Sequence, residues 1–167
     1  MGKFRVGIIG RISVVYRQAF KDVSDLIQVC FAVDKDISRA KAFAAEFEGC
    51  QASNRLEDML QEKPDAIHVC TPHFLHKSHV IAGLKAGCHV LTEKPIALSL
   101  EDAQDMIDTA EKCKRQLGVI FQNRYIEGVQ EAKHLIESGA LGKICGAWSS
   151  LNWHRPPSYY ECDWKGS

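Results

Sequence analysis

Short apolar runs alternate with amphipathic segments over most of this 167-residue chain, and this alternation constrains the fold more than any other feature. The runs are nearly continuous in apolar residues and too short for helices; they lie at 4–10, 27–34, 66–70, 89–92 and 118–121. Such runs are typical of parallel strands that helices cover on both faces of a sheet. The pattern therefore predicts an α/β fold with a doubly wound parallel sheet.

Between and after these runs, apolar residues recur at the spacing of a helix. The clearest helix is expected over 103–113, with Ser99 as its N-cap. The same spacing predicts helices over 80–84 and over 129–136. Strand and helix thus alternate with short connections, which is the arrangement that parallel pairing requires.

The chain after residue 143 has a different character. Residues 144–153 are expected to form one more strand, whereas 155–160 show no periodicity. Three tryptophans, Trp148, Trp153 and Trp164, lie in this region. We expect an exposed apolar patch here, which favours self-association of the chain.

Charge and cysteine content exclude several classes of protein. Lys and Arg number 21 and so do Asp and Glu, so the chain lacks the broad positive field of a nucleic-acid-binding protein. No apolar run reaches the roughly 18–20 residues of a membrane span. The seven cysteines are scattered, odd in number and without a C-x-x-C pair. This favours a reduced, cytoplasmic chain over a disulfide framework.

Polar residues follow the predicted strands. In a doubly wound sheet, ligands bind beyond the carboxyl ends of the strands. The candidate segments are therefore those at 10–13, 34, 71–76, 93–95 and 122–124. Because parallel strands deliver all of these segments to one edge, we expect them to form a single site.

Asp34 closes the second strand and is the candidate for binding an adenosine ribose. A carboxylate there accepts hydrogen bonds from both ribose hydroxyls and repels a 2′-phosphate, which favours NAD over NADP. The alternative is a charge at a helix N-terminus, a role that Asp36 could equally fill.

The first turn departs from the dinucleotide-binding fingerprint G-x-G-x-x-G/A. Gly10 is followed by Arg11, Ile12 and Ser13, and without a gap Ile12 occupies the second glycine position. Taken alone, this turn does not meet the requirement for close backbone approach to a pyrophosphate.

Lys94 follows a strand directly and precedes Pro95. In that position its ammonium could act on a substrate oxygen, and the Lys94–Pro95 bond is a candidate for a cis peptide. The alternative is a surface lysine on a structural turn, and these residues alone favour neither interpretation.

The histidines after the third predicted strand suggest two roles. His73, His76 and His79 have the three-residue spacing of a metal cluster. Pro72, however, places His73 in a loop, and no carboxylate partner accompanies the group. Contacts to a bound ligand are therefore favoured, and no metal site is expected.

Several motifs in the same order resemble one known family. They are TEKPIA at 92–97, CTPHFLH at 70–76, NRY at 123–125 and GALGKI at 139–144. Together the chain resembles the glucose–fructose oxidoreductase / inositol dehydrogenase / MocA family, whose members are NAD(P)-dependent oxidoreductases acting on sugars, polyols and related compounds. The resemblance implies a Rossmann-type domain over 1–122, followed at 123–167 by the beginning of an α/β substrate and oligomerisation domain.

The resemblance also implies roles for individual residues. Those expected to bind the cofactor are Gly10, Arg11, Ile12, Ser13, Asp34, Thr71, Pro72, His73, His76, Glu93, Lys94 and Asn123. Lys94 is in addition the expected catalytic residue, in contact with the substrate hydroxyl near the nicotinamide. The implied partners are therefore a nicotinamide cofactor and a sugar or polyol.

Two departures from the family qualify this interpretation. Members often read GIIGxGRIS at the first turn, with a His three residues later, so a two-residue deletion explains Ile12, Ser13 and Tyr16 together. The deletion removes roughly 7 Å of chain reach and with it N–H groups for a pyrophosphate.

The second departure is that the family's catalytic Asp and His would lie beyond Ser167. We therefore expect little turnover from these 167 residues. The alternative hypothesis is a non-catalytic module that binds nucleotide or protein.

Overall fold

The structure is a computed structural model that describes residues 2–10 and 14–161. The chain divides into two compact units, Met1–Ile120 and Phe121–Ser167. The first contains a β-sheet with its covering helices, and the second contains one α-helix and two short 3-10 helices.

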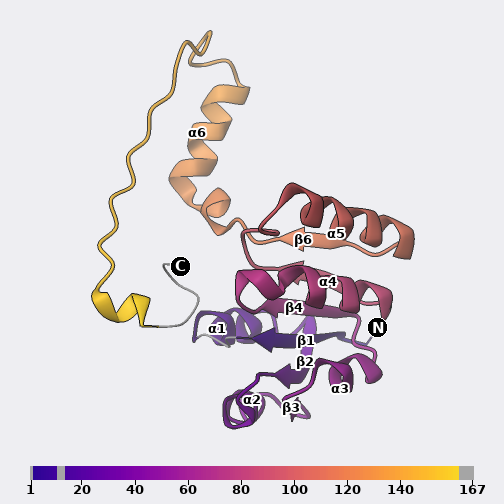
Figure 1. Ribbon diagram of the computed structural model, residues 1–167. Helices are drawn as coiled ribbons and strands as arrows, with labels where there is room; N and C mark the ends of the chain where they lie inside the picture. The colour runs from indigo at the N-terminus through magenta and orange to yellow at the C-terminus, as the bar shows by residue number, and fades with distance from the viewer. Residues whose placement is uncertain (1, 11–13, 162–167) are drawn as a thin grey trace. The chain divides into compact units, whose positions relative to one another are not determined.

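One six-stranded sheet forms the centre of the first unit (Figure 1). Its strands are β1 (Phe4–Gly10), β2 (Ile27–Val33), β3 (Gln51–Ser53), β4 (Ala66–Cys70), β5 (His89–Thr92) and β6 (Leu117–Val119). They lie in the order β3-β2-β1-β4-β5-β6, and every neighbouring pair is parallel. The strand order reverses direction between β1 and β4, where Gly10 pairs with Cys70. The predicted doubly wound, Rossmann-type sheet is confirmed.

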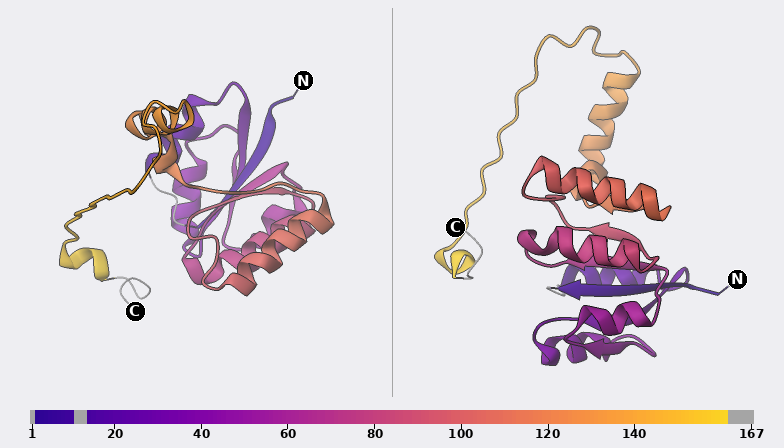
Figure 2. Two further views of the ribbon diagram at one scale, coloured as in Figure 1. Left: turned by 90° about the horizontal axis from the view of Figure 1, so that it is seen from above. Right: turned by 45° about the vertical axis from the view of Figure 1, so that its right-hand side comes forward.

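Helices cover both faces of this sheet (Figures 1 and 2). They are α1 (Val14–Asp22), α2 (Ile37–Ala44), α3 (Leu56–Gln61), α4 (His76–Lys85) and α5 (Leu100–Cys113). On one face, Phe43 of α2 and Phe20 of α1 pack in an apolar cluster with β1 and β2. On the other face, Met59, Leu84 and Met106 bring α3, α4 and α5 into a second cluster. Fully buried side chains in both clusters hold the helices against the sheet.

Side-chain caps define where two of the helices begin. The Ser99 hydroxyl accepts a hydrogen bond from the Asp102 N–H at 3.1 Å, so the predicted N-cap of α5 is confirmed. Asp36 caps α2 in the same way, because its carboxylate accepts from the Ser38 N–H at 3.0 Å. Each cap satisfies a backbone donor that the helix itself leaves unpaired.

A glycine lets α4 approach the sheet closely. A Cβ atom at Gly83 would lie 2.3 Å from Cδ1 of Ile67 on β4, so a side chain would fit there only if Ile67 moved. The first residue of this helix is His76, which follows the loop at the carboxyl end of β4. The packing of α4 therefore fixes His76 near that edge of the sheet.

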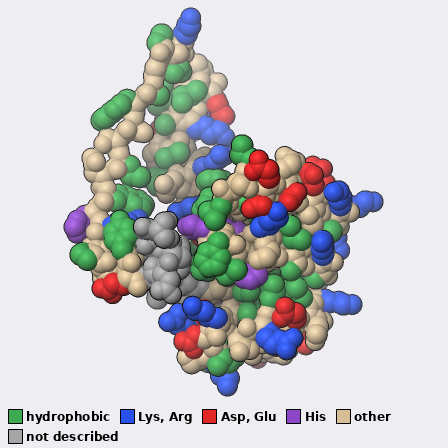
Figure 3. Space-filling model, in the orientation of Figure 1, with side chains coloured by type: hydrophobic (Ala, Val, Ile, Leu, Met, Phe, Trp, Pro, Cys, Tyr) green, Lys and Arg blue, Asp and Glu red, His purple; other side chains and the backbone are tan. Residues whose placement is uncertain are grey.

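The second unit has little buried apolar surface of its own. It contains the 3-10 helix η2 (Gln122–Tyr125), the helix α6 (Glu127–Glu137) and the 3-10 helix η3 (Pro157–Tyr160). Between α6 and η3, Trp148 is 89% exposed and Leu151 is 73% exposed. Apolar side chains gather along this unit at the upper left of Figure 3, as the sequence predicted.

The strand expected over 144–153 is not formed. Within residues 121–161, the structure shows no β-strand that could pair with this segment. An extended segment becomes a strand only when a neighbour satisfies its backbone hydrogen bonds. The apolar pattern of 144–153 therefore lacks the partner that the prediction required.

None of the described helices is long and apolar enough to cross a membrane. The six cysteines within the described ranges are free thiols, and Cys162 lies outside those ranges.

Candidate functional site

The carboxyl ends of four neighbouring strands form one edge of the sheet. Asp34 directly follows β2, Gly10 ends β1, Thr71 follows β4 and Glu93 follows β5. The strand order β2-β1-β4-β5 places these positions in a row. At about 4.8 Å between strands, the row extends over roughly 14 Å. The structure thus brings together residues that the sequence predicted to share one edge, hereafter the carboxyl edge.

Gly10 is in contact with the loop after β4. Its φ angle is +104°, and a Cβ atom would lie 2.6 Å from backbone atoms of Cys70 and Thr71. Both the backbone angle and the close approach exclude a side chain at this position. Arg11, Ile12 and Ser13 lie outside the described residues, so the shortened glycine turn stays a prediction.

Asp34 and Asp36 have different environments at the end of β2. Asp34 is only 5% exposed, and its Oδ1 accepts a hydrogen bond from the Asp36 N–H at 2.9 Å. Asp36 caps α2, and hydrogen bonds from Ser38 hold the pKa of its carboxyl below the usual value. The helix-terminal role that the sequence left open between the two acids is therefore filled by Asp36. The ribose-binding role of Asp34 stays a prediction.

The loop after β4 contains polar side chains that lie at the carboxyl edge. The Thr71 side chain is buried, and its Oγ1 lies 3.1 Å from Nδ1 of His79. Pro72 precedes the 3-10 helix η1 (His73–Leu75), so the loop predicted for His73 is a short helical turn. Burial lowers the pKa of His73, and the nearby His76 and Lys94 act in the same direction.

His76 is fully buried and touches the backbone of two loops. Its Nε2 lies 2.9 Å from the carbonyl oxygen of Thr71, and its Nδ1 lies 2.8 Å from the carbonyl oxygen of Pro95. The ring thus connects the loop after β4 to the turn after β5. Its predicted contact with a cofactor stays a prediction.

The turn after β5 presents Lys94 to solvent. The Lys94–Pro95 peptide bond is cis, as the sequence suggested. The Glu93 N–H donates to the carbonyl of Val69 on β4 at 3.0 Å, and this bond extends the sheet by one residue. The Glu93 side chain is half-buried, and burial raises its pKa while the neighbouring Lys94 opposes the shift. A cation and a carboxyl group therefore lie side by side at this end of the edge.

Two further predictions concern residues away from this row. Asn123 lies in η2, in the second unit, and its role stays a prediction.

Among the residues that the structure describes, no group of three His, Cys, Asp or Glu side chains could hold a metal ion. His76 contacts two carbonyl groups, and His79 contacts the Thr71 hydroxyl. The sequence analysis weighed a metal ligand and a ligand contact for His79, and it did not predict the contact with Thr71.

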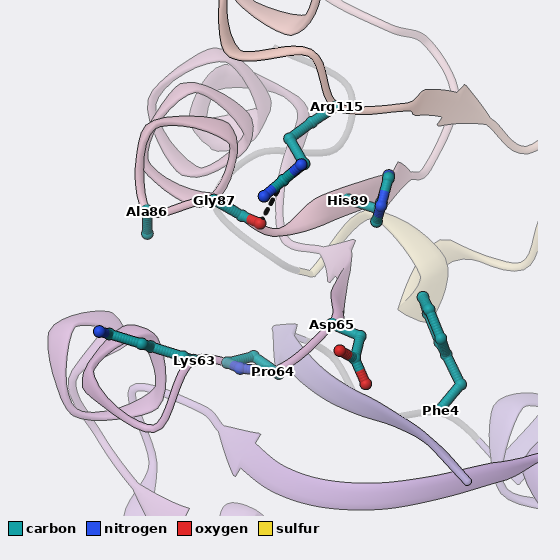
Figure 4. A pocket seen from close by; sticks show the side chains of 8 residues that line it. All are labelled: Phe4, Lys63, Pro64, Asp65, Ala86, Gly87, His89 and Arg115. Atoms are coloured by element: carbon teal, nitrogen blue, oxygen red, sulfur yellow. Dashed lines mark hydrogen bonds between the residues drawn. The ribbon is translucent and has the colours of Figure 1, made fainter. Parts of the chain in front are cut away.

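A separate pocket of about 360 Å³ lies where β4 and β5 begin (Figure 4). The residues that line it are Phe4, Lys63, Pro64, Asp65, Ala86, Gly87, His89 and Arg115. Here the guanidinium of Arg115 donates to the carbonyl of Gly87 (dashed line in Figure 4). The pocket shares no residue with the carboxyl edge.

Comparison with known proteins identifies the family. Residues 4–121 match the model of the glucose–fructose oxidoreductase / inositol dehydrogenase / MocA group, described as an oxidoreductase family with an NAD-binding Rossmann fold. The chain belongs to this family. The family that the sequence motifs resemble is thus confirmed, and its description agrees with the predicted cofactor.

Three proteins illustrate the similarity. D-glucoside 3-dehydrogenase of Escherichia coli strain K12 is 34% identical over 147 residues, which cover 84% of this chain and 41% of that protein. The WlbA dehydrogenase from Bordetella pertussis, solved in complex with NADH and UDP-GlcNAcA, is 30% identical with a TM-score of 0.78. The match covers 84% of this chain and 41% of that structure.

The third is KijD10, a 3-ketoreductase from Actinomadura kijaniata solved in complex with TDP-benzene and NADP. It is 26% identical with a TM-score of 0.73, and the match covers 83% of this chain and 42% of that structure. The chain therefore spans about two fifths of the length of these relatives.

Proposed function

We propose that this chain binds NAD along the carboxyl edge and forms the cofactor-binding part of an oxidoreductase. The reaction is hydride transfer between the nicotinamide and a sugar, a polyol or a related hydroxy compound. The observation that supports this most directly is the row of strand ends, with buried Asp34 at one end and exposed Lys94 at the other. Membership of the family supports the same function.

The residues at the adenosine end fit this cofactor. Asp34 is a buried carboxylate, and Asp36 already serves the adjacent helix, so Asp34 remains available for ribose hydroxyls. Its negative charge would repel a 2′-phosphate, which favours NAD over NADP. Gly10 keeps the end of β1 free of a side chain, as close approach to a pyrophosphate requires.

At the other end, Lys94 is the proposed catalytic residue. The bound nicotinamide supplies the carbon that gives or accepts the hydride. The Lys94 ammonium stabilises negative charge on the substrate oxygen, because a fixed cation lowers the energy of the charged transition state. Half-buried Glu93 lies next to it in the sequence. In this proposal Thr71, Pro72 and His73 complete the nicotinamide end. Asn123, in the second unit, is proposed as a cofactor ligand on the family resemblance alone.

The proposal assigns residues 123–167 to the beginning of the substrate and oligomerisation domain. We expect slow turnover from these 167 residues, because they span about two fifths of the length of the relatives that they match. Cofactor binding, rather than turnover, is therefore the appropriate measurement.

Calorimetric titration with NADH and NADPH tests the proposal. We expect micromolar binding of NADH and weaker binding of NADPH. Asp34→Ala should lower NADH affinity by about 10-fold or more and remove the preference between the two cofactors. Asp36→Ala is the matched control, because it removes the neighbouring carboxylate and only the helix cap. No binding up to millimolar NADH would contradict the proposal and support a non-catalytic module.

The exposed apolar residues of the second unit support self-association of the 167-residue chain. Trp148, Leu151 and Trp153 are 89%, 73% and 60% exposed, and large apolar side chains that gather on a surface often mark a protein contact. Light scattering over a range of concentrations should show a rising mass, whereas a constant monomer mass would contradict this.

We also propose a cytoplasmic location, on the basis of the scattered cysteines without C-x-x-C pairs.

A further inference from the structure

The buried ring of His76 connects two loops of the carboxyl edge. It is 0% exposed, although His76 stands at the beginning of α4 next to an exposed turn. One ring nitrogen lies 2.9 Å from the Thr71 carbonyl and the other 2.8 Å from the Pro95 carbonyl. The contact with Thr71 is buried and the contact with Pro95 is partly buried. A neutral imidazole donates a hydrogen bond to one of these two carbonyls, and a protonated ring donates to both.

The shape of the imidazole ring suits this double contact. Its two nitrogens point in different directions, so one side chain reaches two backbone segments that are 24 residues apart along the chain. An apolar side chain of similar volume would fill the space but could donate a hydrogen bond to neither carbonyl. The ring is therefore a link between the loop after β4 and the turn after β5.

The contact with His76 lies in the part of the turn beyond the last hydrogen bond of the sheet. The Glu93 N–H bonds to Val69 on the neighbouring strand, so the sheet extends to that residue. Lys94 comes next, and the Pro95 carbonyl, one residue further, is the group that contacts His76. The backbone of Lys94 is thus held on one side by the sheet and on the other by the buried ring.

We propose that His76 is a positioning residue for Lys94. The ring fixes the Pro95 carbonyl, and through it the direction in which the Lys94 side chain leaves the turn. In this role His76, which is 0% exposed, acts on Lys94 through the Pro95 carbonyl and needs no contact of its own with the substrate. This inference rests on the proposed function, because it assumes that Lys94 lies at the nicotinamide end of the bound cofactor.

The test compares two ligands that differ in the nicotinamide ring. ADP-ribose has the adenosine, the pyrophosphate and the second ribose but no nicotinamide, which is the group that the proposal places at Lys94. Calorimetry on the 167-residue chain should show that His76→Leu lowers NADH affinity by about 10-fold and leaves ADP-ribose affinity within about 2-fold. Lys94→Met should produce the same selective loss.

A double-mutant cycle distinguishes positioning from general destabilisation. If His76 acts through Lys94, His76→Leu should lower NADH affinity no further once Lys94→Met is present. Additive losses, or equal losses for NADH and ADP-ribose, would show that His76 has no specific role toward Lys94. His89→Leu is the matched control, because that half-buried histidine accepts a hydrogen bond from the Gln116 N–H at the opposite edge. It should leave both affinities unchanged.

Two amide variants cover the case in which His76→Leu does not fold. Asn carries its amide nitrogen near the position of Nδ1, which contacts Pro95, and Gln carries it near the position of Nε2, which contacts Thr71. We expect His76→Asn to keep more NADH affinity than His76→Gln; the reverse order would overturn the inference. Wild-type chain that binds neither ligand would refute the proposed function itself, whereas NADH binding that is insensitive to His76 would refute only the positioning role.

Discussion

His68 should make the first unit less stable in acid. This histidine lies in the middle of β4, 4% exposed, and its ring packs edge-on against Tyr16 of α1 with a centroid distance of 4.8 Å. Its buried Nε2 has no hydrogen-bond partner among the described residues. Burial lowers the pKa of His68 from 6.5 to about 4, because the charged ring would lose its hydration.

The direction of the effect follows from proton uptake on unfolding. Below pH 6.5 the unfolded chain binds a proton at His68, whereas the folded chain binds one only near pH 4. Unfolding therefore takes up a proton throughout this window, and the free energy of unfolding falls as the pH falls. At about 1.4 kcal/mol per pKa unit, the pKa difference corresponds to a loss of about 3 kcal/mol across the window.

Urea unfolding followed by circular dichroism measures this loss. The free energy of unfolding is determined for the wild type and for His68→Leu at the two ends of the window. The substitution should make the pH dependence about 3 kcal/mol smaller. At the upper end the variant should be as stable as the wild type or more so, because the orphan nitrogen is replaced by apolar atoms.

His73 and His79 also have lowered pKa values, mainly through burial, but they are present in both proteins and cancel in the comparison. His134→Leu, at an exposed position of α6, is the matched control and should keep the wild-type pH dependence. An unchanged slope in His68→Leu would refute the reasoning, because it would mean that the buried ring is not the group that titrates.

Three further substitutions test the packing and capping of the first unit by urea unfolding. Gly10→Ala should lower the free energy of unfolding by about 3 kcal/mol, because the new Cβ meets backbone atoms and the φ angle of +104° disfavours a side chain. Gly83→Ala should cost about 1–3 kcal/mol, since Ile67 has to move away from the new methyl group. Gly128→Ala in α6 is the control, because a Cβ there meets nothing within 4 Å. It should leave the urea unfolding transition of the first unit unchanged. Ser99→Ala should cost about 1 kcal/mol through the lost cap of α5, and an unchanged midpoint would contradict the assigned cap.

The sequence predicted the buried strands of the sheet better than its periphery. β1, β4 and β5 begin and end where their apolar runs do, because a strand buried on both faces needs apolar residues throughout. β3 was missed, since its three residues, Gln51–Ser53, are too short and too polar to show a pattern. The helix α3 has only six residues, and a helical period is not visible over so short a segment.

Within the site, the sequence predicted which edge gathers the polar residues but not how each one is used. The positions after parallel strands follow from topology alone, so Asp34 and Lys94 could be placed. The burial of His76 and its contacts with two carbonyls depend on how α4 packs, and no local pattern encodes this. The strand expected at 144–153 failed for a related reason, because a strand depends on a neighbour that its own residues do not specify.

The strand order also has a consequence for synthesis on the ribosome. β1 gains its first neighbour, β2, soon after it emerges, but its other neighbour is β4, and Gly10 pairs with Cys70 sixty residues later. At about 5–20 residues per second, that edge of β1 waits roughly 3–12 seconds for its partner. During this time the nascent chain exposes an apolar strand with unpaired backbone groups, which is the kind of edge on which chains aggregate. The emergence of β4 is therefore the step that covers this edge of β1.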